Sequence, residues 1–231
     1  MNQQNTTIQR WLRKPLWTYT FLGIQTVVFL LMYLFPSLSI EQTGSMFGPY
    51  VAIYHEYWRF ITPIFIHFGL MHFAVNSVVL YFMGTQIEEI YGHWRFFTIY
   101  IASGILGNLA SFAMNQAGTI SAGSSTALFG LFGAFLVLGA HFKSNPAIQN
   151  MVRQFALFVG LSFLFGFFDS SIDIWGHIGG ILGGLLLGNI VALPQQRGNY
   201  SVHPRIISGL IFLFLVVICF LLGLKKYGLL V

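Results

Sequence analysis

Two residues of this chain, Ser125 and His177, have the side chains that nucleophilic acyl transfer requires. A neutral imidazole within hydrogen-bond distance of a hydroxyl takes its proton during attack and later returns it to the leaving group. His72 and Asn76, about one helical turn apart, could donate hydrogen bonds to a developing oxyanion together with the backbone amide of Ser125. These four residues are therefore a candidate site, provided that the fold brings them together.

The elements that must position these residues are membrane helices. Of the 231 residues, 56% are hydrophobic and only 7% are charged. Apolar runs of about 20 residues, the length that crosses a bilayer as a helix, recur along the sequence. We predict an all-α polytopic membrane protein with spans near residues 17–35, 62–83, 95–114, 124–141, 151–169, 174–193 and 206–224.

The chain divides into parts by its hydropathy. We expect an N-terminal cytoplasmic tail at 1–16, a membrane domain carrying the site at 17–195, and a linker with an additional C-terminal span at 196–231. The longest external loop runs from Pro36 to about Ile61 and is rich in aromatic residues. Such a loop is expected to lie at the headgroup level of the membrane.

Basic residues indicate the orientation of the chain. A cluster before the first span predicts a cytoplasmic N-terminus under the positive-inside rule. Eight of the eleven Lys and Arg residues then fall on the cytoplasmic side: Arg10, Arg13, Lys14, Arg95, Lys143, Arg153, Arg197 and Arg205. The terminal pair Lys225 and Lys226 disagrees with this orientation.

The distribution of charge also bears on partners and location. The net charge of +5 is scattered over the loops, so it predicts no nucleic-acid partner. We expect an integral multi-pass protein whose partners include the lipid bilayer. Because no organelle presequence precedes the first span, we expect a bacterial plasma membrane. The single cysteine, Cys219, excludes an internal disulfide, and the sequence gives no indication of oligomeric state.

Orientation places the candidate residues at one depth. The spans that carry His72, Ser125 and His177 all run from outside to inside, and Ser125 and His177 lie in the first turns of theirs. The sixth span has glycine at every fourth position, from Gly176 to Gly188, and such a face allows another helix to approach closely. Gly130 and Gly133 in the fourth span are the expected counterparts, so the polar side chains should converge beneath the outer surface.

At these residues the sequence resembles a known family. Residues 122–133, AGSSTALFGLFG, resemble the nucleophile segment of rhomboid intramembrane serine proteases. Further rhomboid landmarks follow in the expected order: Trp58, Arg59, His67, His72, Asn76, Gly84, Glu88, Gly92, Arg95, Phe96, residues 176–180 (GHIGG) and Gly184. The resemblance covers about residues 15–195.

The resemblance implies a rhomboid-like six-helix core followed by a seventh, C-terminal transmembrane helix. It implies Ser125 as nucleophile, His177 as general base and acid, and His72 and Asn76 as oxyanion donors. The substrates would be membrane proteins, cut in or next to a transmembrane segment near the outer membrane face. This chemistry requires no cofactor and no metal ion.

The resemblance also implies which residues support the site rather than react. Trp58, Arg59, His67 and Glu88 would shape the loop and helix framework. The fifth span, with the end from Phe165 to Asp169, would be a moving wall that admits the substrate sideways.

Three further residues lie close in sequence to the proposed catalytic pair, Ser125 and His177, and each has an expected role. Thr126 stands where rhomboids usually have glycine, and it adds bulk where the fourth and sixth spans approach each other. Phe129, one turn after Ser125, is expected to stack on the His177 ring. Asp173, four residues before His177, is expected to be a helix N-cap rather than the third member of a triad.

Other functions fit the sequence less well. A metalloprotease motif H-E-x-x-H is missing, and Asp169 and Asp173 flank one loop instead of lying on two helices. A transporter or channel would be expected to show inverted repeats or several intramembrane charges. The remaining alternative is a weak or inactive rhomboid-like protein that binds transmembrane clients, and the presence of both Ser125 and His177 argues against it.

Overall fold

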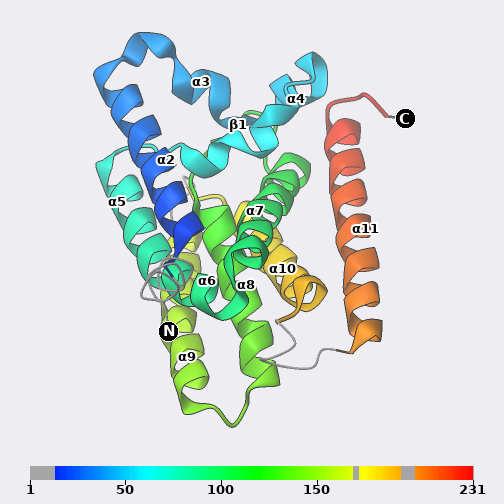
Figure 1. Ribbon diagram of the computed structural model, residues 1–231. Coiled ribbons are helices and arrows are strands. Elements are labelled where there is room, and N and C mark those ends of the chain that lie inside the picture. Colours follow the sequence, from blue (N-terminus) through cyan, green and yellow to red (C-terminus); the bar gives the residue numbers. More distant parts are fainter. Residues whose placement is uncertain (1–13, 169–171, 194–200, 231) are drawn as a thin grey trace, which may run out of the picture.

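A computed structural model of the chain describes residues 14–168, 172–193 and 201–230. For Phe163 and residues 165–168 it describes the backbone alone. These residues form an all-α fold (Figure 1) with a single two-residue antiparallel ladder between β1 (Met46–Phe47) and β2 (Ile120–Ser121). The boundary expected between residues 195 and 196 lies outside the described residues, as do Arg10, Arg13 and Arg197 of the topology argument.

The long helices agree with an integral multi-pass membrane protein. They are α2 (Leu16–Leu34), α5 (Leu70–Val79) continuing through the π-type turn η4 (Leu80–Gly84) into α6 (Thr85–Tyr91), α7 (His93–Met114), α8 (Ser125–His141), α9 (Pro146–Phe168), α10 (Ile174–Val191) and α11 (Val202–Lys226). Among the described residues, five stretches are long and apolar enough to cross a membrane: α2, the continuous segment Leu70–Tyr91, α7, α10 and α11. Helix α8 is shorter, whereas α9 has 23 residues and is about 35 Å long.

The segment between α2 and α5 contains short helical turns. These are η1 (Pro36–Leu38), α3 (Ile40–Gly44), α4 (Gly48–Tyr54), η2 (Tyr57–Phe60) and η3 (Thr62–Phe65). The second span was expected from residue 62, but α5 begins at Leu70. Residues 62–69 are as apolar as the helix that follows, yet Pro63 starts a 3₁₀ turn and Gly69 has a φ of +86°, so no regular helix passes through them.

The last span also differs from its expected bounds. Helix α11 runs from Val202 to Lys226, whereas the span was expected at 206–224. Pro204 therefore lies in the first turn of the helix. The amide that proline lacks would have no intrahelical partner at that position, so the helix includes it without a lost hydrogen bond.

Helix α10 packs against both α7 and α8 at the centre of the protein. A Cβ on Gly184 would overlap the carbonyl of Gly130, and one on Gly133 would overlap the carbonyl of Ile181. The close approach of the fourth and sixth spans through Gly130 and Gly133 is thereby confirmed. It brings the N-terminal ends of α8 and α10, and with them the candidate site, into contact.

Candidate active site

Ser125 and His177 form a direct contact between the first turns of α8 and α10. The Nε2 atom of His177 lies 2.9 Å from the Oγ of Ser125, and only 5% of the histidine is exposed. In the tautomer that carries its proton on Nδ1, His177 accepts the Ser125 hydroxyl proton through Nε2. This is the arrangement in which an imidazole activates a hydroxyl as a nucleophile.

The stacked ring of Phe129 holds the imidazole of His177 in one plane. The two ring centroids are 4.0 Å apart and the planes differ by 7°. Phe129 is one turn after Ser125 on α8 and is 2% exposed. The stacking expected for Phe129 is confirmed, and it limits the rotation of the imidazole about its Cβ–Cγ bond.

The turn before Ser125 requires glycine. Gly123 has a φ of +128°, and a Cβ there would lie 2.6 Å from the Nε2 of His72 and 3.5 Å from the Oγ of Ser125. The imidazole of His72 and the hydroxyl of Ser125 therefore both lie next to the Gly123 backbone.

Asn76 lies one turn after His72 on α5 and donates a hydrogen bond within its own helix. Its Nδ2 donates to the carbonyl of His72, 3.0 Å away and one turn back on α5, and Asn76 is 6% exposed. The structure thus brings Ser125, His177 and His72 together, and one N–H of the Asn76 amide is used within its own helix.

His67 fixes the segment that precedes the serine. Its Nε2 lies 3.2 Å from the Oγ of Ser124 and 3.3 Å from the backbone nitrogen of Ser124. Burial, reinforced by the neighbouring His72, lowers the pKa of His67 from 6.5 to about 3, against a smaller opposing effect of the Phe65 backbone. A neutral His67 accepts a hydrogen bond from the Ser124 amide through its Nε2 and so positions the start of α8.

Asp173 is the N-cap of α10, as expected. Its Oδ1 accepts a hydrogen bond from the backbone nitrogen of Gly176 at 2.8 Å, and its carbonyl accepts one from the nitrogen of His177 at 3.0 Å. Two side chains at the end of α7, Ser111 and Asn115, also donate to this carboxylate. The sequence analysis did not identify Ser111 and Asn115 as partners of Asp173. The signal in the sequence was their spacing of one helical turn at the end of an apolar segment.

Thr126 fits the helix contact because two glycines face it. A Cβ on Gly107 would lie 2.8 Å from the Cβ of Thr126, and one on Gly176 would lie 3.0 Å from its Cγ2. Thr126 is 4% exposed, and its hydroxyl has no hydrogen-bond partner among the described residues. The added bulk is therefore accommodated by small residues on α7 and α10.

The other expected framework residues, Trp58, Arg59 and Glu88, contact neither Ser125 nor His177 in the hydrogen bonds described below. Arg59 pairs with Glu56 at 2.5 Å and donates to the carbonyl of Ser45 at 2.6 Å within the segment between α2 and α5. The Glu88 carboxylate accepts hydrogen bonds from the backbone nitrogens of Trp17 and Thr18 at the start of α2, at 2.8 Å each. Trp58 donates through its ring nitrogen to a carbonyl of the segment between α2 and α5.

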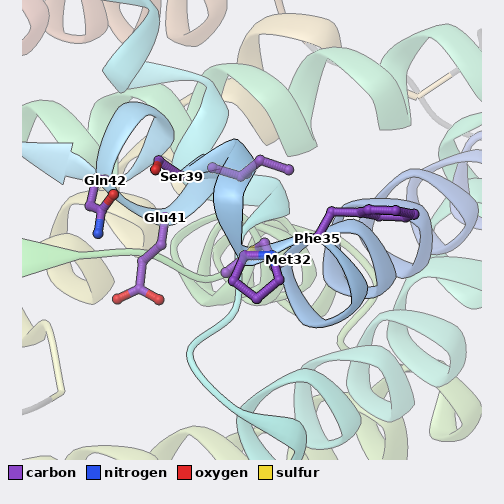
Figure 2. A pocket seen from close by; sticks show the side chains of 7 residues that line it. Met32, Phe35, Ser39, Glu41 and Gln42 are labelled. Carbon is purple, nitrogen blue, oxygen red and sulfur yellow. The ribbon is translucent and has the colours of Figure 1, made fainter.

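A cavity of ≈ 180 Å³ lies apart from these residues, where the end of α2 meets η1 and α3 (Figure 2). It is lined by Met32, Phe35, Pro36, Ser39, Ile40, Glu41 and Gln42. Within the described part of the chain, no group of three or more His, Cys, Asp or Glu residues could hold a metal ion. The segment from Phe165 to Asp169, expected to be a moving wall, lies outside the residues whose side chains are described.

Comparison with known proteins gives one family. The sequence model of the Rhomboid domain matches residues 54–194. The chain is 34% identical over 219 residues to the rhomboid protease GluP of Bacillus subtilis (strain 168), covering 94% of this chain and 41% of that protein. It is 31% identical over 142 residues to the putative rhomboid protease YdcA of the same organism, covering 62% of this chain and 71% of that protein. It is also 34% identical over 154 residues to rhomboid-type serine protease 2 of Emericella nidulans, covering 65% and 29% respectively. The chain therefore spans less than half the length of two of these three relatives.

Proposed function

Because this chain belongs to the rhomboid family, we propose that it is an intramembrane serine endopeptidase with Ser125 and His177 as its catalytic dyad. The observation that carries the proposal is the 2.9 Å contact between the Oγ of Ser125 and the Nε2 of His177 at the ends of two membrane helices. Relatives named as proteases support the same activity. The substrates are membrane proteins, cut in or next to a transmembrane segment.

The reaction follows from the positions of these groups. The Oγ of Ser125 attacks the scissile carbonyl while His177 takes its proton, and the imidazolium then protonates the leaving amine. Water, deprotonated by His177, hydrolyses the resulting acyl-enzyme. The developing oxyanion would be stabilised by the Ser125 amide at the start of α8, where the helix dipole favours negative charge, and by His72 beside Gly123.

Asn76 is the fourth group of this proposal. One N–H of its amide donates to the His72 carbonyl in the structure, and the same nitrogen carries a second N–H that would donate to the developing oxyanion. A hydrogen bond formed only in the transition state raises turnover without strengthening substrate binding. This gives Asn76 a kinetic signature different from that of a binding residue.

The membrane determines access to the site and the choice of substrate. The N-terminus is cytoplasmic in this proposal, the dyad lies beneath the outer face of a bacterial plasma membrane, and water enters from outside. A substrate helix hides its carbonyls in hydrogen bonds, so cleavage favours segments with small or helix-breaking residues. The parts of the chain are an N-terminal tail at 1–16, the catalytic domain at 17–195 and the C-terminal extension at 196–231.

The test is cleavage of a single-span model substrate by the purified protein in lipid vesicles. Wild type is compared with Ser125→Ala and His177→Ala at equal amounts of folded protein. Cleavage by wild type and its loss in both variants supports the dyad. If no substrate is cut but a transmembrane client co-purifies with wild type, the chain is a binding protein and the proposal is wrong.

A further inference from the structure

Helix α11 ends against the C-terminal turn of α7 (Figure 1). A Cβ on Gly223 of α11 would overlap the ring of Phe112, so the two helices touch at this point. Tyr227, just after α11, stacks on the same ring with centroids 5.7 Å apart, and its hydroxyl donates to the carbonyl of Ala117 at 3.2 Å. The end of α11 is therefore fixed against one turn of α7.

Lys226 adds a charged contact at the same place. Its Nζ donates to the carbonyl of Phe112 and, at 2.9 Å, to the carbonyl of Asn115. Helix α7 ends at Met114, so these carbonyls belong to the group that a helix leaves without intrahelical partners. A cation there also interacts favourably with the helix dipole. Lys226 thus caps α7 from a helix more than one hundred residues away in the sequence.

The turn of α7 that Lys226 caps is the turn that holds Asp173. The Nδ2 of Asn115 donates to the Oγ of Ser111 at 2.7 Å and to the Oδ1 of Asp173 at 3.0 Å. The Ser111 hydroxyl donates to the second carboxylate oxygen of Asp173. The Asp173 carboxylate in turn accepts a hydrogen bond from the Gly176 amide, and the Asp173 carbonyl accepts one from the His177 amide. Asn115 therefore links Lys226 to the first turn of α10, because its carbonyl accepts from Lys226 and its side chain donates to Asp173.

We propose that Lys226 is a positioning residue for His177, and that α11 thereby belongs to the catalytic apparatus. The proposal rests on the function proposed above. Without the lysine, the carbonyls of Phe112 and Asn115 lose their partner and the last turn of α7 loosens. Asn115 and Ser111 then hold Asp173 less firmly, and the imidazole departs from the geometry in which it can accept the Ser125 proton.

The kinetic test uses three variants in vesicles with the model substrate. Lys226→Met keeps the length of the side chain and removes the donor and the charge. We expect kcat to fall about tenfold with KM within about twofold, because a small displacement of the base affects the chemical step and not substrate binding. Lys226→Arg, which restores a cationic donor, should recover most of the activity.

The matched control is Lys225→Met. Lys225 is the preceding residue on α11 and its side chain is exposed, so this variant removes the same charge at nearly the same depth. If Lys226 only anchored the helix end to lipid headgroups, the two methionine variants would behave alike, and that result would overturn the proposal.

A second measurement does not depend on protease activity. Hydrogen exchange of the purified protein follows the amides of residues 111–117 and 174–178. Lys226→Met should speed exchange at Gly176 and His177, while the amides of α2 and α5 stay as in wild type. Unchanged exchange at α10 would overturn the proposal, and so would faster exchange everywhere, since that indicates a general loss of stability.

The cleavage kinetics and the hydrogen exchange together distinguish a failure of the Lys226 proposal from a failure of the proposed function. If wild type and Lys226→Met cleave with the same kcat, Lys226 does not position the base, even if wild type is a protease. If wild type cleaves nothing, the proposed function fails on its own, and the exchange at residues 174–178 still decides whether Lys226 orders the first turn of α10.

Discussion

At the scale of single residues, the immediate surroundings of Ser125 and His177 restrict motion. Phe129 covers one face of the imidazole, and Gly123 allows the turn that places the Ser125 hydroxyl beside His72. A nucleophile and a base that are held in place before the substrate arrives need less reorganisation during reaction. Two substitutions test whether the stacked ring and the Asn76 amide act on the chemical step.

Phe129→Leu should lower kcat by about two- to tenfold, because an aromatic stacking contact is worth about 0.5–1.5 kcal/mol beyond buried area. Phe135→Leu is the matched control: Phe135 lies on the same helix, is fully buried and stacks on Phe155 instead of His177. Kinetics per folded enzyme should separate them. Equal losses in the two variants would mean that Phe129 only packs the core.

Asn76→Ala should lower kcat by about 10- to 1000-fold with little change in KM, as expected for a lost oxyanion donor. Asn189→Ala is a suitable control, since Asn189 donates to the carbonyl four residues back on α10 just as Asn76 does on α5. Steady-state kinetics in vesicles provide the comparison. A rise in KM alone would remove Asn76 from the oxyanion site.

At the scale of helices, the dyad depends on how closely α8 and α10 approach and on how α10 begins. Backbone meets backbone where Gly184 lies on Gly130, and Asp173 ties the first turn of α10 to the end of α7. The contact also gives Lys226, one of the two terminal lysines that disagree with the positive-inside rule, a role within the fold. A lysine that caps α7 has a structural use at that end of the bundle, whichever side of the membrane it faces.

Gly184→Ala should destabilise the protein by about 1–3 kcal/mol and reduce activity, because its Cβ would overlap the Gly130 carbonyl and the two helices would have to separate. Gly209→Ala in α11 is the control, since a Cβ there meets nothing within 4 Å. Thermal unfolding in detergent, followed by cleavage assays, distinguishes them. A neutral Gly184→Ala would show that the contact tolerates displacement.

Asp173→Asn should keep kcat within about threefold of wild type, because an asparagine side chain can still cap the helix. Asp173→Ala should cost about 1–2 kcal/mol of stability through the lost cap. Thermal unfolding and cleavage rates give both quantities. An effect of Asp173→Asn as severe as that of His177→Ala would instead make Asp173 a member of a triad.

At the scale of the whole molecule, stability should depend on pH through His67. Its pKa is lowered to about 3 in the fold from 6.5, so above pH 6.5 the histidine is neutral in both folded and unfolded states. Below 6.5 the unfolded chain binds the proton first, and the stability that this histidine contributes is lost as the pH falls towards 3. The free energy of unfolding should decrease by up to about 1.4 kcal/mol per pH unit in this window.

Denaturant unfolding measured between pH 7 and 4 checks this dependence. His67→Gln should flatten the curve, because glutamine does not titrate, while it lowers stability at pH 7 by weakening the contact with Ser124. An unchanged slope in the variant would assign the pH dependence to other groups.

Local patterns in the sequence predicted most of the membrane helices, selected Ser125 and His177 as candidate residues and identified Asp173 as an N-cap. Hydropathy and helical spacing are properties of neighbouring residues, so they can be read without the fold. Two features depended on tertiary structure: the glycines that accommodate Thr126, and the connection from Lys226 to Asp173 through α7. The polar contacts among them join residues 58 or more positions apart, and no local pattern specifies which of many polar side chains will meet when the helices pack.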